Sequence, residues 1–492
     1  MQSNEIAFLA YYPTKKRQKN NSFEGNYNIG ANVIMDVLKR NGIGCDICTP
    51  DTAKNYKIVL ISLTSDYDCI ALYRAIALLP TWQPRRKFTV IAGGAGMQNP
   101  TTIRKYVDYA VFGRAENVIY PLVDCVMGGG IYTHESVMNL PEIHPVTLAQ
   151  SVELYSHDID LGNGRGCRQW KESFIGCPNK CLFCYYTWAR KRVGEGDTYY
   201  QGDLTMKRSI ECLWKDIPKI NKKQGRIRSA IDGFSERLRM VYGKKIANQE
   251  IIDGINHLGI YDGITVLLIY NISNMPHETQ EDRDELYTIV KQADPKNRVV
   301  VVLQSTPFRP SLLTPLQWAP VTLYPATSDL SAQVIYDSDN LRIMHSFSNE
   351  SPWSQLETVI ISRATSETDK LFHILCFHPE LKKGTAWERV GLLRRSFDLA
   401  PYLREYSVDE KHPAWFLSSY TDSSRLRRIY KIAERKFTKS KGRKPKPTAL
   451  LEFEKGNLYS DQRDRAEMES SPQKRSSPGV PERGGCKPWR TK

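Results

Sequence analysis

Three cysteines lie close together in residues 175–188, which read I-G-C-P-N-K-C-L-F-C-Y-Y-T-W. Cys177, Cys181 and Cys184 have the spacing C-x3-C-x2-C, and a short loop with this spacing brings three soft thiolate ligands to one side of a metal cluster. Because a 4Fe-4S cube normally takes four thiolates, three of them leave one iron open to a non-protein ligand. The spacing therefore predicts an iron-sulfur centre with one reactive corner.

Two other interpretations of these thiols stay open. A zinc site would need a fourth Cys or His at short spacing, and none follows Cys184 nearby. Three unrelated buried thiols are the second alternative, because Cys is among the residue types that are most often buried. Cys167 could approach the loop in space, but its distance along the chain from Cys177 argues against a ligand role.

The three-cysteine loop resembles the motif of the radical S-adenosylmethionine (SAM) superfamily, including an aromatic residue, Phe183, directly before the third cysteine. In that superfamily the open iron binds the amino and carboxylate groups of SAM, and electron transfer cleaves SAM to a 5′-deoxyadenosyl radical. The resemblance implies a 4Fe-4S cluster, SAM as a cofactor with Phe183 at its site, and an electron donor such as flavodoxin or ferredoxin.

Residues 1–130 alternate between apolar strand-like segments and helix-like segments. We expect strands over residues 6–12, 44–48, 56–62, 88–92 and 109–112, and helices over 28–40, 69–79, 100–106 and 117–126. Apolar strands separated by helices predict an α/β domain with a parallel, doubly wound (Rossmann-like) sheet. Cys45 and Cys48 form a C-x2-C pair without a neighbouring His, and we interpret them as core thiols.

The loops at the carboxyl ends of these strands carry hydroxyls and glycines, in Ser62-Leu-Thr-Ser and Gly93-Gly94-Ala-Gly. Ligands of doubly wound sheets bind at this edge. A domain of this kind before a radical SAM core resembles the cobalamin-binding domain of B12-dependent radical SAM proteins. Residues 113–116, Gly-Arg-Ala-Glu, keep the first and last residues of that family's Gly-Glu-Gly-Glu. The resemblance makes Ser62, Gly93, Gly94 and Glu116 candidate cobalamin contacts, and a plain scaffold without a corrin is the alternative.

Residues 131–166 have the polar, Pro- and Gly-containing composition of a linker, and residues 167–420 would form the radical SAM core with a C-terminal extension. We expect helices over 205–220 and 248–258, a helix capped by Thr279, and strands over 226–231, 263–271, 299–303 and 341–347. This alternation is what a partial (β/α)6 barrel of the TIM type needs. The family resemblance makes Ser235 and Glu236 candidate SAM contacts, and the alternative is a helix cap with a first-turn charge.

The net charge of +15 is concentrated at the C-terminus. Residues 421–492 contain 20 Lys and Arg against 9 Asp and Glu, which gives +11 and leaves +4 for the rest of the chain. We expect a basic helix over 424–437 followed by a low-complexity, largely disordered tail. Such a tail is solvated by default, and binding to nucleic acid or to an acidic partner is the alternative.

No stretch approaches the roughly 18 uninterrupted apolar residues that a membrane span requires, and the first residues lack a basic region followed by an apolar run. Of the eleven cysteines, the eight outside residues 175–188 are scattered without a regular spacing, which argues against a disulfide framework. We therefore expect a cytoplasmic protein without a membrane partner.

The function that these expectations favour is a radical SAM enzyme that transfers a methyl group, with the help of cobalamin, to an unactivated centre of an unknown substrate. One alternative keeps the radical and replaces methyl transfer by a rearrangement or an oxidation. A second alternative, from a different class, is a nucleic-acid-binding protein with a structural cluster and a basic tail.

Overall fold

The computed structural model describes residues 5–11, 29–83, 86–150, 156–160, 167–171, 175–177, 179–191, 193, 210–211, 214–323, 332–346, 351–419 and 421–441. Two compact units are distinguished along the chain, Met1–Phe437 and Thr438–Lys492. The predicted tail beyond residue 441 lies outside the described residues. Within them, no helix combines the length and apolar character that crossing a membrane requires.

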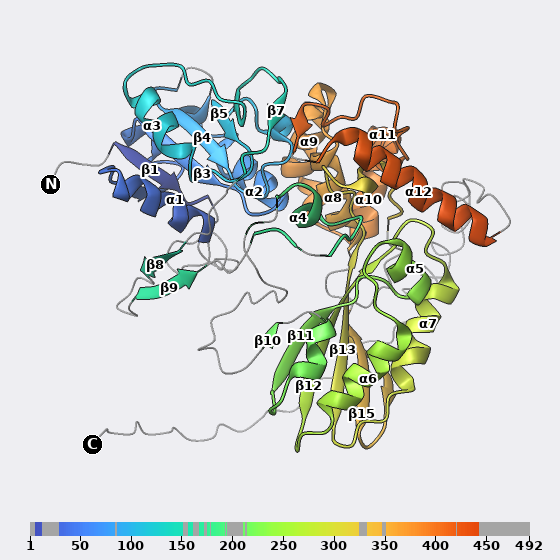
Figure 1. Cartoon of the computed structure of the whole chain (residues 1–492). Coiled ribbons are helices and arrows are strands. Elements are labelled where there is room, and N and C mark those ends of the chain that lie inside the picture. The colour runs from blue at the N-terminus through green and yellow to red at the C-terminus, as the bar shows by residue number, and fades with distance from the viewer. Residues whose placement is uncertain are drawn as a thin grey trace, which may run out of the picture. The chain divides into compact units, whose positions relative to one another are not determined.

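The first sheet has six strands in the order β2-β1-β3-β4-β5-β6 (Figure 1). Its strands are β1 (Ile6–Leu9), β2 (Asp46–Cys48), β3 (Ile58–Ser62), β4 (Thr89–Gly93), β5 (Tyr109–Val111) and β6 (Val137–Asn139). The first five pair in parallel, in the 2-1-3-4-5 order of flavodoxin-like sheets, and β6 is antiparallel to β5. The predicted parallel α/β sheet is therefore present, with one added edge strand.

Helices cover both faces of this sheet. Apolar residues of α1 (Ile29–Arg40) and α3 (Ile119–Met127) share one core with Phe8 and Leu60 of the strands. On the other face, α2 (Tyr67–Ile76) shares a core with residues such as Leu9 and Val59. Because consecutive strand residues point to opposite faces, β3, whose first four residues are buried, supplies side chains to both cores.

Four helices from the C-terminal part of the chain join the core on the α2 side. They are α8 (Pro352–Ser362), α9 (Asp369–Phe377), α10 (Ala386–Ser396) and α11 (Ala400–Leu403). The ring of Tyr73 on α2 meets the ring of Phe372 edge to face at 5.0 Å. Arg363, which follows α8 and is 1% exposed, donates hydrogen bonds to four carbonyl oxygens, those of Gln317, Ala319, Tyr402 and Arg404.

The second sheet has the order β10-β11-β12-β13-β15-β14. Its strands are β10 (Ile210–Glu211), β11 (Arg226–Ala230), β12 (Thr265–Ser273), β13 (Val299–Pro307), β14 (Ala332–Asp337) and β15 (Leu341–Ser346). Five strands are parallel, and β14 runs antiparallel to β15. The described residues thus form five parallel strands and one antiparallel edge strand, and the expected barrel of six strand-helix units stays a prediction.

One face of the second sheet packs on α6 (Asn248–Leu258) and α7 (Gln280–Lys291). Every second residue of β12 is buried, beginning with Thr265, as a strand with one helix-covered face requires. As predicted, Thr279 precedes α7, and its backbone N–H donates to the carboxylate of Asp282 at 2.8 Å. This capping fixes where the chain after β12 turns back along the sheet.

Two predictions about local structure are wrong. The helix expected over residues 205–220 is replaced, where the chain is described, by β10 and by a 3₁₀ helix, Trp214–Lys219. The expected linker, residues 131–166, contains β6, β7 (Val146–Thr147) and β8 (Ser156–Asp160). β8 pairs with β9 (Cys167–Lys171), and β7 pairs with β16 (Leu417–Ser418) from far along the chain. Short strands of this kind are stabilised by distant partners, which local composition does not reveal.

The predicted basic helix is present as α12 (Ser423–Lys441), and it packs against the rest of the first unit. Leu426, Tyr430, Ala433 and Phe437 recur at intervals of three or four residues and are each at most 3% exposed. They share a core with Tyr242, Trp318 and Tyr406. The helix is therefore an integral part of the fold.

Replacing Leu426 by alanine is expected to lower the free energy of unfolding by about 2 to 4 kcal/mol, because it leaves a cavity in this core. Chemical denaturation followed by circular dichroism measures the change. The matched control is Ile432→Ala on the same helix, where the side chain is 45% exposed and the expected loss is below about 0.5 kcal/mol. Equal losses in the two variants would contradict the packed position of α12.

Candidate functional site

The cysteine loop, residues 175–188, is held by its own hydrogen bonds. Ile175 and Val193 exchange backbone hydrogen bonds at 3.0 and 3.3 Å. The indole N–H of Trp188, on the short helix α4 (Tyr185–Trp188), donates to the carbonyl of Cys181 at 2.8 Å. The Thr187 hydroxyl donates to the carbonyl of Asn179 at 2.9 Å. The loop is therefore closed on itself around its second cysteine.

Two segments that follow strands of the second sheet fix the loop from outside. The backbone N–H of Leu182 donates to the carbonyl of Tyr242 at 2.9 Å, and its carbonyl accepts from the N–H of Leu316 at 3.3 Å. Tyr242 follows α5 (Glu236–Val241), which comes after β11, and Leu316 lies beyond β13. The cysteine loop thus lies next to the chain that leaves the carboxyl ends of these two parallel strands, where α/β proteins place their ligands.

Gly243 lets one of these segments approach closely. Its φ is +84°, and a Cβ atom added there would lie 2.4 Å from the carbonyl oxygen of Lys180. Only a residue without a side chain fits both the left-handed backbone and this contact. The backbone at Gly243 therefore sets the position of the loop between its first two cysteines.

Cys177, Cys181 and Cys184 are all free thiols. Burial raises the pKa of Cys181 to about 12 and also raises the pKa of Cys184, and the nearby Cys177 thiol adds a smaller increase to both. Within the described part of the chain, no three His, Cys, Asp or Glu side chains converge closely enough to hold one metal ion. The thiols of a 4Fe-4S cube bind different irons, so three separate free thiols on one loop fit such a group.

Phe183, the aromatic residue before Cys184, is half-buried and packs against the core that contains Leu182, Trp188 and Tyr242. These apolar neighbours would limit the access of water to a cluster bound by the thiols. A contact between Phe183 and SAM stays a prediction.

A buried ion pair lies beside the cysteines. Lys244 Nζ is 2.6 Å from a carboxylate oxygen of Asp232, and both side chains are less than one fifth exposed. Burial by itself would lower the pKa of Lys244, but Asp232 and the thiols of Cys181 and Cys177 raise it above its usual value. The ammonium group in turn lowers the pKa of Cys181, against the larger effect of burial.

Sequence reasoning did not single out Lys244 or Asp232. Nothing in the composition or spacing around these two residues points to the cysteines. Asp232 has φ +51°, an uncommon conformation for a residue other than glycine that often marks a functional position. The left-handed backbone of Asp232, just after β11, is visible only in the structure and marks this residue as a candidate functional position.

Ser235 and Glu236 are engaged in the scaffold. Ser235 is 0% exposed; its hydroxyl donates to Asp282 at 2.6 Å and accepts the N–H of Leu238 at 3.2 Å, which caps α5. A carboxylate oxygen of Glu236 accepts the N–H of Asn248 at 2.7 Å. The structure thus gives both residues the capping roles that were the alternative interpretation, and their contact with SAM stays a prediction.

The candidate cobalamin contacts lie along the carboxyl edge of the first sheet, at or just beyond the ends of β3, β4 and β5. The carbonyl of Ser62 accepts the Tyr11 hydroxyl at 2.9 Å. Gly93 ends β4, and a Cβ atom at Gly94, which has φ +106°, would lie 2.3 Å from the carbonyl oxygen of Leu63. Glu116 forms a 2.6 Å ion pair with Arg114. The space beside Gly94 is filled by the backbone of Leu63, so this glycine serves contact between loops, and binding of cobalamin at this edge stays a prediction.

Charged residues are buried next to this edge. Burial raises the pKa of Asp66 to about 6 and that of Glu357, on α8, to about 7, while Arg309 lowers both to a smaller extent. The guanidinium of Arg309 lies 5.2 Å from the ring centroid of Tyr67 and donates to its hydroxyl at 3.3 Å. The segment after β13 therefore reaches the loop that follows β3 in the first sheet.

Glu357→Gln is expected to stabilise the protein increasingly as the pH rises from about 4.5 to about 7. Because the folded-state pKa of about 7 exceeds the usual 4.5, the folded protein binds the extra proton between these values and loses stability as pH rises through them. The variant should gain about 2 to 3 kcal/mol over the parent at pH 8 and nothing near pH 4.5. Thermal unfolding from pH 4.5 to 8 checks this, and a pH-independent difference would contradict it.

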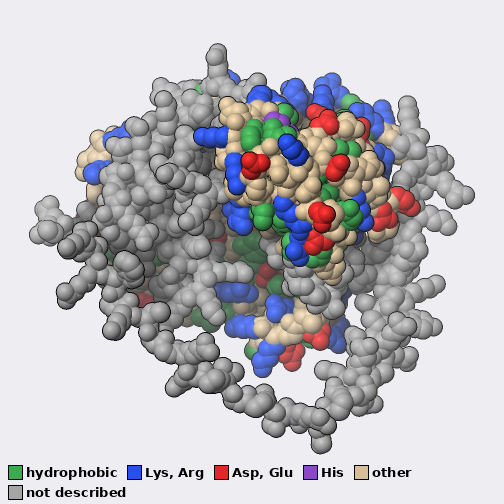
Figure 2. Space-filling model, turned by 90° about the horizontal axis from the view of Figure 1, so that it is seen from below, with side chains coloured by type: hydrophobic (Ala, Val, Ile, Leu, Met, Phe, Trp, Pro, Cys, Tyr) green, Lys and Arg blue, Asp and Glu red, His purple; other side chains and the backbone are tan. Residues whose placement is uncertain are grey.

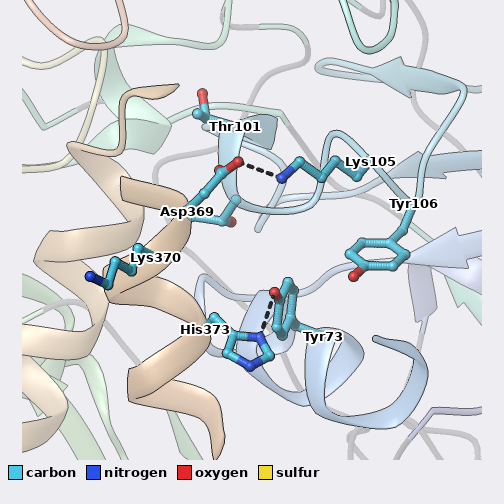
Figure 3. Close-up of a pocket in the computed structure, with 8 residues that line it drawn as sticks. Tyr73, Thr101, Lys105, Tyr106, Asp369, Lys370 and His373 are labelled. Atoms are coloured by element: carbon cyan, nitrogen blue, oxygen red, sulfur yellow. Dashed lines mark hydrogen bonds and ion pairs between the residues drawn. The ribbon is translucent and has the colours of Figure 1, made fainter. Parts of the chain in front are cut away.

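A separate cavity of about 260 Å³ lies between α2, the chain around Thr101 and α9 (Figure 3). Lys105 points to Asp369 across it at 2.8 Å, and the Tyr73 hydroxyl faces His373 Nδ1 at 3.2 Å. None of the predicted site residues lines this cavity. The structure thus keeps it apart from the cysteine loop and from the edge of the first sheet.

Comparisons with known proteins give little guidance. No protein-family model matches the chain, and no curated protein matches it. Among solved structures, one match is the cobalamin-dependent S-adenosylmethionine radical enzyme OxsB with aqua-cobalamin and S-adenosylmethionine bound, at 12% identity over 94% of this chain and 71% of that chain, with a TM-score of 0.25. The same enzyme with aqua-cobalamin bound matches at 12% identity over 94% and 72%, with a TM-score of 0.26. At these TM-scores the likeness carries no argument, so the function rests on the residues of the site.

Proposed function

We propose that this chain is a radical SAM enzyme whose cysteine loop holds a 4Fe-4S cluster through Cys177, Cys181 and Cys184. The observation that carries the proposal is the position of three free thiols on one closed loop beside the carboxyl ends of β11 and β13. Catalytic groups of strand-helix folds gather at this edge. A reducing cytoplasm would keep these thiols free.

The residues of the chain would position and shield the cluster. The hydrogen bonds of Leu182 and Trp188 fix the loop, and the cation of Lys244 lies where thiolates gain from a positive charge. A cluster with one iron free of thiolate supplies, when bound, the chelation and the electron that cleave SAM. The apolar residues around Phe183 would limit the access of water to the group that the thiols hold.

We further propose that the first sheet binds cobalamin along the loops of Ser62, Gly93, Gly94 and Glu116, and that the reaction is methyl transfer to an unactivated centre. The 2-1-3-4-5 strand order and the glycine-ended β4 support a ligand at this edge. Cobalamin supplies, when bound, a carrier for a methyl group. Arg309 and Tyr67 link this edge to the chain that follows β13 of the second sheet.

Anaerobic reconstitution with iron and sulfide, followed by dithionite and SAM, tests the radical chemistry. We expect 5′-deoxyadenosine to form in proportion to the cluster content. Protein that holds a full cluster and forms no 5′-deoxyadenosine would overturn the proposal. Methyl transfer is tested in the same reaction with added cobalamin, where S-adenosylhomocysteine should accumulate; its absence would leave radical chemistry without methylation.

A bound cobalamin is expected to lack a protein imidazole on its lower face. The chain contains no His before His134, so the first 133 residues offer no imidazole to the cobalt. Paramagnetic resonance of the cob(II)alamin state measures this, because an axial nitrogen splits the signal. Such splitting would contradict the expectation. If the protein retains no cobalamin, the first sheet is a scaffold that binds no corrin.

A further inference from the structure

Helix α12 presents a basic face on the side away from its buried residues. Its exposed cations are Arg425, Arg427, Arg428, Lys431, Arg435 and Lys436. Up to Phe437 the helix has one acidic residue, Glu434, and that carboxylate lies 2.9 Å from Nε2 of His277. The exposed side therefore carries positive charge without a carboxylate of its own. On the face of the molecule that Figure 2 shows, by contrast, cationic and anionic side chains are interspersed.

Most of these cations are not neutralised by neighbours. Lys431 lies 3.7 Å from Asp409, a carboxylate that is itself mostly exposed. In the part of the chain that the structure describes, Arg425, Arg428 and Arg435 form no ion pair. Ile432 lies among them and is 45% exposed, which gives the basic face an apolar centre. Cations around an exposed aliphatic side chain are typical of a surface that meets another protein.

The opposite side of α12 is in contact with the support of the cysteine loop. The ring of Phe437 lies 5.3 Å from the ring of Tyr242, whose carbonyl accepts the hydrogen bond of Leu182, between Cys181 and Cys184. Phe437 also stacks on His277 at 4.7 Å, and the guanidinium of Arg237 lies 5.1 Å from its ring centroid. One helix therefore separates the basic face from the segment that holds the cysteines (Figure 1).

We propose that the basic face of α12 docks an acidic, low-potential electron-donor protein of the flavodoxin or ferredoxin class. This inference rests on the proposed function, which requires one electron for each SAM that is cleaved. The reduced donor loses that electron and the cluster held by the cysteine loop gains it, so the step is balanced. Complementary charge would steer the donor to the side of the molecule where the cysteine loop lies.

A nucleic acid would also be attracted to these cations. Two observations favour a protein. Ile432 supplies an apolar contact that a phosphate backbone does not use. The buried side of the helix also shares a core with Leu182 and Trp188 of the cysteine loop, which must receive the electron. Binding of nucleic acid is therefore an outcome that the experiment has to separate from binding of the donor.

The test is the variant Arg425→Glu/Arg428→Glu/Arg435→Glu, compared with the parent and with Lys222→Glu/Lys291→Glu/Lys296→Glu. The control makes the same charge change at exposed positions at or near the amino-end side of the second sheet. Binding of a reduced or oxidised flavodoxin is measured by interferometry at 50 and 300 mM salt. We expect at least about tenfold weaker binding for the α12 variant, loss of most of the salt dependence, and no change for the control.

Turnover separates this inference from the proposed function. Formation of 5′-deoxyadenosine driven by flavodoxin and its reductase should fall by at least about tenfold in the α12 variant, while formation driven by dithionite stays at the parent level. Parent protein that is inactive with dithionite would overturn the radical function, whereas the binding measurement would still test the surface. Unchanged donor binding in the variant, or loss of binding to a short RNA duplex alone, would overturn the docking proposal.

Discussion

Replacing Cys177, Cys181 or Cys184 singly by alanine is expected to abolish both the iron-sulfur cluster and SAM cleavage. Three thiolates are the smallest protein ligand set that holds the cube with one iron open, so removal of any one exposes a second iron to solvent. Iron and sulfide analysis, the broad visible absorbance of the cluster and 5′-deoxyadenosine formation measure the loss. All three readouts should fall to the level of cluster-free protein.

Cys45→Ala is the control for these variants. Cys45 lies outside the cysteine loop, directly before β2, and its side chain packs against the core that α1 and α3 share with the first sheet. We therefore expect it to act as a core thiol without a part in ligation. The control should keep the full cluster and full cleavage. Retention of both in Cys177→Ala, Cys181→Ala or Cys184→Ala would refute the ligand assignment and favour the interpretation as unrelated thiols.

The strands of the first sheet could be predicted from the sequence because their signal is local. β3 and β4 are continuous apolar segments, and the structure places them within two residues of the expected bounds. The cysteine loop could also be recognised from the sequence, since its three cysteines lie within eight residues of the chain. In both cases the residues that carry the signal are neighbours in sequence.

Helix α8 shows why other parts of the fold could not be predicted. Nearly all of its residues are buried, including Gln355 at 0% and Glu357 at 7% exposure, so it has no polar stripe to set a helical period. The Gln355 amide is satisfied by the carbonyl of Phe308 at 2.8 Å, a partner from a distant segment. A helix enclosed on all sides, with buried polar residues, leaves no amphipathic pattern in the sequence.

Of the candidate site, the sequence identifies the three cysteines but not the charged residues that lie beside them. Lys244 and Asp232 reach the cysteines because β11 ends beside the loop and the chain returns to it at Gly243. That approach depends on pairing between distant strands, and single residues such as lysine or glycine carry no sign of it. Ser235, a candidate SAM contact by the family resemblance, uses its hydroxyl to cap α5, which was the alternative interpretation.

Gly243→Ala is expected to disrupt the cysteine loop while all three thiols remain. The new Cβ atom would lie 2.4 Å from the carbonyl oxygen of Lys180 and 3.5 Å from Cα of Cys181, so the backbone on one side has to move. The left-handed conformation adds about 1 to 2 kcal/mol of strain, and the overlap a further 1 to 3 kcal/mol or so. We expect a loss of about 2 to 5 kcal/mol in the free energy of unfolding and a large loss of iron.

Gly42→Ala is the control that separates the effect of the left-handed backbone from the effect of the close contact between Gly243 and Lys180. Gly42 has φ +78°, close to the +84° of Gly243, but no atom lies within 4 Å of its added Cβ. This variant should therefore lose only the conformational strain, about 1 to 2 kcal/mol, and should keep the iron content of the parent. Denaturation and iron analysis of the two variants, purified in parallel without oxygen, give both numbers. If Gly243→Ala keeps its cluster and matches Gly42→Ala in stability, the backbone at Gly243 does not position the cysteines, and the hydrogen bonds of Leu182 and Trp188 must hold the loop alone.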